Sequence, residues 1–218
     1  MIVISLGGSR IIPKDIDVDF LLELRKAILR KISSSPKEKI AIVCGGGFLA
    51  RTYQNSLRNI FERSITKDSR KDERSSNVTL DRLGILATKM NAFLVKSMFR
   101  GIKNVSVHSG TVPGHSTDFV ATSIASRHKS STVINFSNIL YVYDKDPRLN
   151  KDAVRIERIS YSDFEKQFGK EWVPGKNVPF DPKALALAKK KRIKVIFSDS
   201  IPDLENALDG KYSGTIIG

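Results

Sequence analysis

Cysteine is nearly absent from this 218-residue sequence, in which Cys44 stands alone. One cysteine cannot form an internal disulfide, so a disulfide-stapled domain is excluded and we expect a reducing, cytoplasmic setting. Cys44 ends an apolar run, which predicts an inert buried thiol. No apolar run approaches the roughly 20 residues of a membrane-spanning helix. The N-terminus lacks the basic-then-apolar pattern of a signal peptide, so we expect neither a leader nor a membrane anchor.

Aromatic residues are also few, at 8%, and acidic residues are outnumbered. There are 37 Lys and Arg residues against 23 Asp and Glu, which gives a net charge of +14. Such an excess indicates a nucleic-acid partner, an anionic substrate or a generally basic proteome. The basic clusters at 67–74 and 189–192 are not interleaved with aromatic residues, as a base-stacking surface requires. This pattern argues against nucleic acid as the main partner.

Short apolar runs alternate with amphipathic helical patterns along the whole chain. We expect strands at 2–6, 39–44, 105–108, 132–136, 194–197 and 215–217. We expect helices at 17–33, 48–60, 78–99, 119–127, 160–168, 182–191 and 201–208. This order predicts an α/β fold, a three-layer α/β/α sandwich with a mainly parallel central sheet. We expect one domain over residues 1–218, with a division into lobes near residue 128.

The segment 62–77 interrupts this alternation. It holds seven charged residues between Lys67 and Arg74 and almost nothing apolar. A segment of this composition favours a solvated loop or a helix extension. A basic contact surface is the alternative.

Two glycine clusters each follow an apolar strand. Gly7-Gly8 follows 2–6, and a run of three glycines ending at Gly47 follows 40–44. Glycine lets the backbone approach a phosphate closely, and free N–H groups at a helix N-terminus point towards it. A third polar loop, 112–118, carries glycine, histidine, serine and threonine. Together these loops predict a ligand with several phosphates, or two phosphorylated ligands.

Several short motifs occur in a fixed order along the chain. They are Leu6-Gly7-Gly8-Ser9, Cys44-Gly45-Gly46-Gly47 with Ala50-Arg51, Leu80-Asp81, Pro113 to Asp118, Ser137-Asn138, Tyr143 to Pro147, and Asp181-Pro182. In this order the chain resembles the amino acid kinase superfamily and, within it, the uridylate kinases of the archaeal type. The resemblance implies transfer of the ATP γ-phosphate to UMP with Mg²⁺, giving UDP for pyrimidine nucleotide biosynthesis. It also implies a cytoplasmic homohexamer, with the acceptor bound by residues 1–128 and ATP by residues 129–218.

The resemblance assigns roles where the motifs match. It implies ATP contacts from Gly7, Gly8, Ser9, Gly47, Arg51, Ser137, Tyr143 and Asp146. Among these, Gly8, Ser9 and Arg51 would act in catalysis. It implies UMP contacts from Gly46, Asp81, Thr111, Val112, Pro113, Gly114, His115, Ser116 and Thr117. No protein ligand for a metal ion is implied.

The chemistry of these residue types agrees with the roles that the resemblance implies, although ordinary capping or packing roles stay open for several of them. Phosphoryl transfer depends on positioning and charge stabilisation, which glycine amides and an arginine supply. Asp81 is a suitable acceptor for a ribose diol, or else a helix N-cap or first-turn acid. Ser116 and Thr117 hold a phosphate, or cap the next helix. Tyr143 packs on adenine, or is an ordinary strand aromatic. His115 is not needed as a base, because the UMP phosphate is already anionic at pH 7.

Three positions depart from the pattern. Ser5 stands where many relatives carry lysine, and Ala186 stands at another common lysine site, with Lys183 one turn earlier as a substitute or a surface residue. Leu140-Tyr141 replaces an Asp-Gly turn beside the expected ATP site. Two alternatives therefore stay open: a kinase for another small acid or phosphate acceptor, such as isopentenyl phosphate, and a non-catalytic relative that binds nucleotide or oxyanion.

Overall fold

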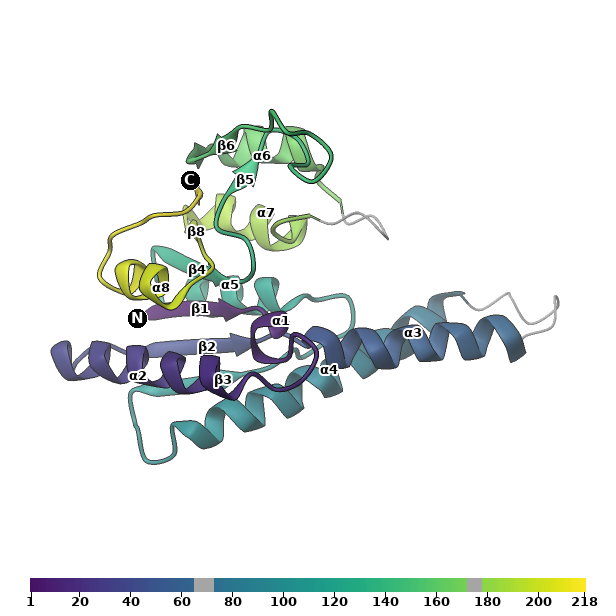
Figure 1. Cartoon of the computed structure of the whole chain (residues 1–218), viewed down its shortest axis with the longest axis horizontal. Coiled ribbons are helices and arrows are strands. Elements are labelled where there is room, and N and C mark those ends of the chain that lie inside the picture. Colours follow the sequence, from purple (N-terminus) through teal and green to yellow (C-terminus); the bar gives the residue numbers. More distant parts are fainter. Residues whose placement is uncertain (65–72, 172–177) are drawn as a thin grey trace.

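The computed structural model describes residues 1–64, 73–171 and 178–218 (Figure 1). Its strands are β1 (Ile2–Leu6), β2 (Ile40–Cys44), β3 (Val105–His108), β4 (Thr132–Phe136), β5 (Val142–Tyr143), β6 (Arg155–Ile156), β7 (Arg158–Ile159), β8 (Lys194–Ser198) and β9 (Ile216–Ile217). Its helices are α1 (Gly8–Ile11), α2 (Val18–Ser34), α3 (Gly47–Ser64), α4 (Glu73–Met98), α5 (Thr117–Arg127), α6 (Tyr161–Phe168), α7 (Pro182–Lys191) and α8 (Ile201–Leu208).

One seven-stranded sheet forms the centre of the molecule, in the order β3-β2-β1-β4-β8-β9-β7. Strands β3, β2, β1, β4 and β8 run parallel, and among the described strands of this sheet β8–β9 is the antiparallel pair. Strands β5 and β6 form a separate two-stranded antiparallel sheet. The register aligns Ile4 with Ile42 on one side and with Ile134 on the other. The parallel order confirms the predicted α/β fold. It also brings the carboxyl ends of β1, β2 and β4 to the same edge, where ligands bind in open parallel sheets.

Helices cover both faces of the sheet, so the central strands are mostly apolar and do not alternate between apolar and polar residues. Successive side chains point to opposite faces. One core lies towards α2 and α8 and contains Ile4, Ile42, Ile134, Ile196 and Leu204. The other lies towards α5 and α7 and contains Val3, Val43, Val133, Val195 and Leu185. Helices α3 and α4 pack against each other and project together beyond the sheet (Figure 1).

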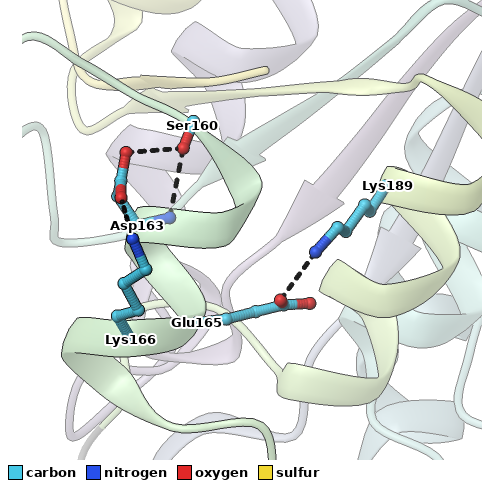
Figure 2. Close-up of polar contacts among 5 residues, drawn as sticks. All are labelled: Ser160, Asp163, Glu165, Lys166 and Lys189. Atoms are coloured by element: carbon cyan, nitrogen blue, oxygen red, sulfur yellow. Dashed lines mark hydrogen bonds and ion pairs between the residues drawn. The ribbon is translucent and has the colours of Figure 1, made fainter.

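Helix α6 is fixed at its start by Ser160 and against α7 by an ion pair (Figure 2). The Ser160 hydroxyl accepts from the Asp163 backbone N–H at 3.1 Å and donates to the Asp163 carboxylate at 2.7 Å. Lys189 Nζ of α7 lies 2.7 Å from Glu165 Oε2, whose side chain is only 13% exposed. The cap at Ser160 confirms the predicted start of this helix. Such a cap contributes about 1 kcal/mol.

Some elements were not predicted. Strands β6 and β7 are two residues long and carry no periodic signal, and they exist only because β5 and β9 lie beside them. Helix α4 begins at Glu73, five residues before the expected start. The charged segment 62–77 is helical at both ends, because α3 continues to Ser64, and its residues 65–72 lie outside the described part.

Cys44 is buried at the end of β2, and loss of solvation raises the pKa of its thiol to about 12. The prediction of an inert buried thiol is confirmed, since the thiolate is the reactive form. Within the described ranges, every helix is too short or too polar to cross a bilayer.

Candidate functional site

The two glycine loops lie against each other at the carboxyl edge of the sheet. The Gly45 amide donates to the Leu6 carbonyl at 2.8 Å, and the Gly7 amide donates to the Phe136 carbonyl at 2.8 Å. A Cβ atom added to Gly8 would lie 2.1 Å from the Gly47 nitrogen. A residue with any side chain would therefore force the two backbones apart. The contact makes the two loops one continuous backbone surface.

Backbone donors at this surface are left without partners. Within the described chain, the amides of Gly8, Ser9, Gly46 and Gly47 donate to no protein acceptor. The carbonyls beside them are occupied, because Asn91 Nδ2 of α4 donates to the Gly45 oxygen at 2.7 Å. Backbone N–H groups without a protein acceptor can bind an anion, so these four amides are candidates for the phosphate site that the glycine clusters predicted.

A cavity of about 690 Å³ opens beside the second glycine loop. Its walls come from α3, α4, the 110–118 loop and the start of α7. The lining side chains and backbone include Gly46, Gln54, Arg58, Asn77, Asp81, Gly84, Thr88, Gly110, Val112, Gly114, His115, Ser116, Thr117, Asp118, Asp181 and Lys183. A volume of this size is sufficient for a nucleotide-sized ligand. The cavity joins Val112 and residues 114–117 of the predicted acceptor loop to Asp81 and Gly46. Thr111 and Pro113, also predicted to contact UMP, are not among its lining residues, and Thr111 lines a separate cavity beside β3.

Asp81 and Lys183 both contact Gly114 across the cavity. The Gly114 amide donates to Asp81 Oδ2 at 2.7 Å, and Lys183 Nζ donates to the Gly114 carbonyl at 3.1 Å. Asp81 lies in the middle of α4, eight residues after Glu73, so the alternative of a helix cap or first-turn acid is wrong. The carboxylate is therefore free to serve a ligand once the Gly114 amide is exchanged.

A polar network lies between the cavity and β1. The Ser5 hydroxyl donates to Asp118 Oδ1 at 2.7 Å, although the two residues are 113 apart in sequence. The Ser116 hydroxyl donates to the Asp181 carboxylate. Ser116 also caps α5 by accepting from the Phe119 amide at 3.1 Å, so the capping alternative holds for this residue. The network fixes the end of the acceptor loop to β1 and to α7.

Asp118 has an altered ionisation. Loss of solvation, assisted by the negative charge of Asp181, raises its pKa to about 6. The Ser5 hydroxyl and the Asp181 backbone N–H oppose that rise by stabilising the carboxylate. In the unfolded chain the same group would titrate near 3.8. Ionised Asp118 therefore costs the folded state free energy at neutral pH.

This cost gives a pH prediction for Asp118→Asn. A raised folded pKa means that the wild type loses stability as pH rises from about 4 to about 6, whereas the Asn variant has no such titration. The Tm of the variant relative to wild type should therefore rise by up to roughly 5–10 °C between pH 4 and pH 7. A pKa raised by about 2 units corresponds to at most about 3 kcal/mol, and 1 kcal/mol shifts the Tm of a chain of this size by about 2–4 °C. Thermal unfolding followed by circular dichroism at both pH values measures it. If the difference in Tm between the variant and wild type is the same at both pH values, Asp118 does not have a raised pKa in the folded protein.

Several residues assigned to ATP lie away from this cavity. Arg51 is exposed in the first turn of α3 and is not among the lining residues. Asp146 is held by Arg148, whose Nη2 lies 2.7 Å from Oδ2, and this partner lowers the Asp146 pKa to about 2. Tyr143 is half-buried in β5, and its carbonyl accepts from Gln167 at 2.6 Å. Ser137 lies beside the first glycine loop, where a Cβ on Gly7 would be 3.2 Å from the Ser137 Cβ.

The residues that sequence reasoning left without a role include Ser5, Asn91 and Asp181, whereas Lys183 was offered as a lysine substitute or a surface residue. Asn91 is 2% exposed, and only its contact with the second glycine loop reveals its function. Ser5 and Asp118 lie on elements far apart in sequence, so no spacing rule links them. Asp181 precedes a proline at a helix start, and that N-cap signal was available from the sequence.

The chain is similar to known proteins along nearly its whole length. The model of the amino acid kinase family matches residues 1–114 and 103–199. A protein named uridylate kinase from Thermoplasma volcanium is 36% identical, over 97% of this chain and 94% of the relative. Its counterpart from Thermoplasma acidophilum is 35% identical, over 96% and 92% of the two chains.

Solved structures agree with the sequence relatives. The crystal structure of uridylate kinase from Archaeoglobus fulgidus superimposes with a TM-score of 0.78 at 27% identity, covering 100% of this chain and 99% of the other. A UMP kinase from Ureaplasma parvum, at 21% identity and a TM-score of 0.72, covers 100% of this chain and 97% of its own, and supports the fold.

Proposed function

Because this chain belongs to the amino acid kinase family, we propose that it is an ATP-dependent UMP kinase that converts UMP to UDP. The observation that carries the proposal is the contact between the two glycine loops beside the Asp81 cavity. Phosphoryl transfer requires donor and acceptor oxygens in line and close together. Two anion-binding loops in backbone contact provide that proximity.

On the donor side we propose that the amides of Gly8, Ser9 and Gly47 bind the ATP phosphates. These amides have no protein acceptor within the described residues. Arg51 follows Gly47 by one turn of α3 and is exposed to solvent, where its guanidinium can reach a donor phosphate. The nucleoside part of ATP would lie towards Ser137, Tyr143 and Asp146 in the C-terminal lobe. Asp146 would have to exchange Arg148 for a ligand.

On the acceptor side we propose that UMP occupies the cavity between α4 and the 111–117 loop. Asp81 would accept from the ribose hydroxyls after release of the Gly114 amide. Thr111, Val112 and Pro113 would lie along the base, and Gly46 would meet the phosphate. His115 is exposed and stacks on Phe119 with ring centroids 4.4 Å apart, which favours a loop-shaping role.

We infer that Mg²⁺ enters with ATP. The described residues contain no group of three or more His, Cys, Asp or Glu side chains that could hold a metal ion. Mg²⁺ is commonly held by substrate phosphates and water with few protein ligands. The ion would neutralise charge on the transferring phosphoryl group, while the glycine amides hold its other oxygens.

We also propose a homohexamer in the cytoplasm, serving pyrimidine nucleotide synthesis. Helix α4 supports self-association, because Leu86, Met90 and Phe93 are 55%, 63% and 75% exposed along one side of it. An apolar stripe of this kind is typical of subunit contacts. Light scattering coupled to size-exclusion chromatography measures the number of subunits.

An ADP-release assay across acceptors tests the proposed activity. UMP should give turnover with ATP and Mg²⁺, and kcat/KM for UMP should exceed that for CMP, AMP, isopentenyl phosphate or acetylglutamate by about 100-fold, the discrimination expected from hydrogen-bonded recognition. EDTA should abolish the reaction. Turnover with another acceptor alone would identify a different kinase of the superfamily. ATP binding without turnover on any acceptor would indicate a non-catalytic nucleotide-binding protein.

A further inference from the structure

We propose that Lys183 contacts the phosphate of the acceptor nucleotide through its ammonium group. The proposal rests on the proposed UMP-binding function of the same cavity. Lys183 is the second residue of α7, and its side chain is exposed to the cavity that it lines. Nζ donates to the neutral carbonyl of Gly114 at 3.1 Å. Among the described residues, no carboxylate lies within ion-pair distance of Nζ, so its charge is not neutralised by a protein group.

The position of α7 brings this charge to the end of the cavity that faces β1. Asp181 caps α7 by accepting from the Lys183 backbone N–H at 3.0 Å. The Asp181 carboxylate accepts from the Ser116 hydroxyl at the start of α5, and Asp118 in the first turn of α5 accepts from Ser5. Ser5 lies two residues before Gly7, where the first glycine loop begins. Lys183 is therefore held, through Asp181, Asp118 and Ser5, to the strand that leads into the donor-phosphate loop.

The other permanently charged cation on the described cavity wall lies elsewhere. Arg58 is on α3, eleven residues beyond Gly47, which places it about 16 Å along the helix from the second glycine loop. Its guanidinium donates to Asn55 Oδ1 at 2.7 Å. A phosphate that receives a phosphoryl group must lie within a few ångströms of the donor loops. Arg58 therefore starts about three helical turns from the donor loops, whereas Lys183 Nζ lies on the cavity wall, 3.1 Å from the Gly114 carbonyl.

Charge balance makes a cation necessary at this end. Asp118 and Asp181 both lie on the cavity wall there, and UMP and ATP bring several more negative charges. Without a compensating cation, the carboxylates would repel the acceptor phosphate at short range. In the described part of the wall, Lys183 is the lysine that can compensate them. A flexible four-carbon stem lets its ammonium group follow a phosphate oxygen.

Ligand binding would then be an exchange of partners at Gly114. In the empty cavity the Gly114 peptide uses both Asp81 and Lys183. A ribose hydroxyl would replace its amide on Asp81, and a phosphate oxygen would replace its carbonyl on Lys183. The second exchange adds the attraction between two opposite charges to a hydrogen bond that the ammonium group previously made to a neutral oxygen. Lys183 would therefore favour ligands that carry the phosphate.

The test compares UMP with uridine, which lacks only the phosphate. NMR titration reaches millimolar affinities and gives Kd for both ligands with wild type, Lys183→Ala, Lys183→Arg and Lys190→Ala. We expect Lys183→Ala to raise the Kd of UMP by about 10-fold to 100-fold and the Kd of uridine by less than about 2-fold. Lys183→Arg should restore part of the UMP affinity. Lys190→Ala, an equal change at an exposed residue of the same helix, should leave both unchanged.

Two outcomes would overturn the proposal. If Lys183→Ala weakens UMP and uridine equally, Lys183 acts by holding Gly114 and does not touch the phosphate. If neither affinity changes, Lys183 has no role in acceptor binding. Turnover of the wild type with UMP separates the proposed activity from this inference. If the wild type does not turn over UMP, the proposed kinase activity is wrong. The Lys183 contact is tested separately, by the affinities for UMP and uridine.

Discussion

Replacing Gly47 with alanine is expected to reduce kcat/KM by at least about 100-fold, with either ATP or UMP as the varied substrate. The added Cβ would lie 2.1 Å from the Gly8 oxygen and 2.4 Å from the Gly8 carbonyl carbon. These are backbone atoms of the other glycine loop, so relief requires the two loops to separate. A misplacement of about 1 Å in a phosphoryl-transfer site costs about this factor in rate. Steady-state kinetics with each substrate measure the loss.

A control separates the contact from the backbone conformation. Gly47 has φ of +61°, which alone disfavours alanine by about 1 kcal/mol. Gly210 has φ of +78° and no heavy atom within 4 Å of an added Cβ. Gly210→Ala should therefore lower the Tm by a few degrees and leave kcat/KM within about 2-fold of wild type. If Gly47→Ala behaves like Gly210→Ala, the paired glycine loops are not the phosphate site.

Asp81→Asn is expected to raise the KM for UMP by about 10-fold to 100-fold with little change in kcat. The carboxylate can accept from two ribose hydroxyls, and a charged acceptor contributes about 1.5–3 kcal/mol per hydrogen bond. An asparagine oxygen still accepts from the Gly114 amide, so the empty loop should keep its position. The measurement is the KM for UMP and for 2′-deoxy-UMP. The variant should lose the preference of the wild type for UMP over the deoxynucleotide.

The matched control is Asp19→Asn, the same change in the exposed first turn of α2. It removes one charge from the protein without touching the cavity, so it measures the general effect of net charge on a nucleotide substrate. An unchanged KM for UMP in Asp81→Asn, or an equal loss for both nucleotides, would contradict the ribose contact. A parallel fall in kcat would show that Asp81 acts on the reaction itself.

Much of the fold could be predicted from local sequence pattern. The run at 40–44 is continuously apolar and buried, and those at 2–6 and 132–136 are mostly so, because helices cover both faces of the sheet. The start of α4 was placed five residues too late, since its first turns carry polar residues without apolar periodicity. Strands β6 and β7 were missed for a related reason: two residues carry no period, and only their neighbours in the sheet make them strands.

Part of the candidate site could also be predicted from the sequence, and part could not. Both glycine loops and the 111–117 loop were visible in the sequence, because unusual backbone geometry demands unusual residues. Asp81 was assigned to the acceptor, but its place within a helix was misjudged. The contact from Asn91 to the second glycine loop and the pair of Ser5 with Asp118 had no sequence signal. Each joins residues that are 46 or 113 positions apart.

The sequence by itself determined the layered α/β fold and the positions of three polar loops that can meet phosphates, because periodicity and glycine act over a few neighbouring residues. Only the tertiary structure decided that the first two loops touch and that Lys183 faces the cavity. It also decided that Asp118 is desolvated enough to raise its pKa to about 6. These properties depend on distances between segments that are remote in the chain. Those distances are determined by how the helices pack on the parallel sheet.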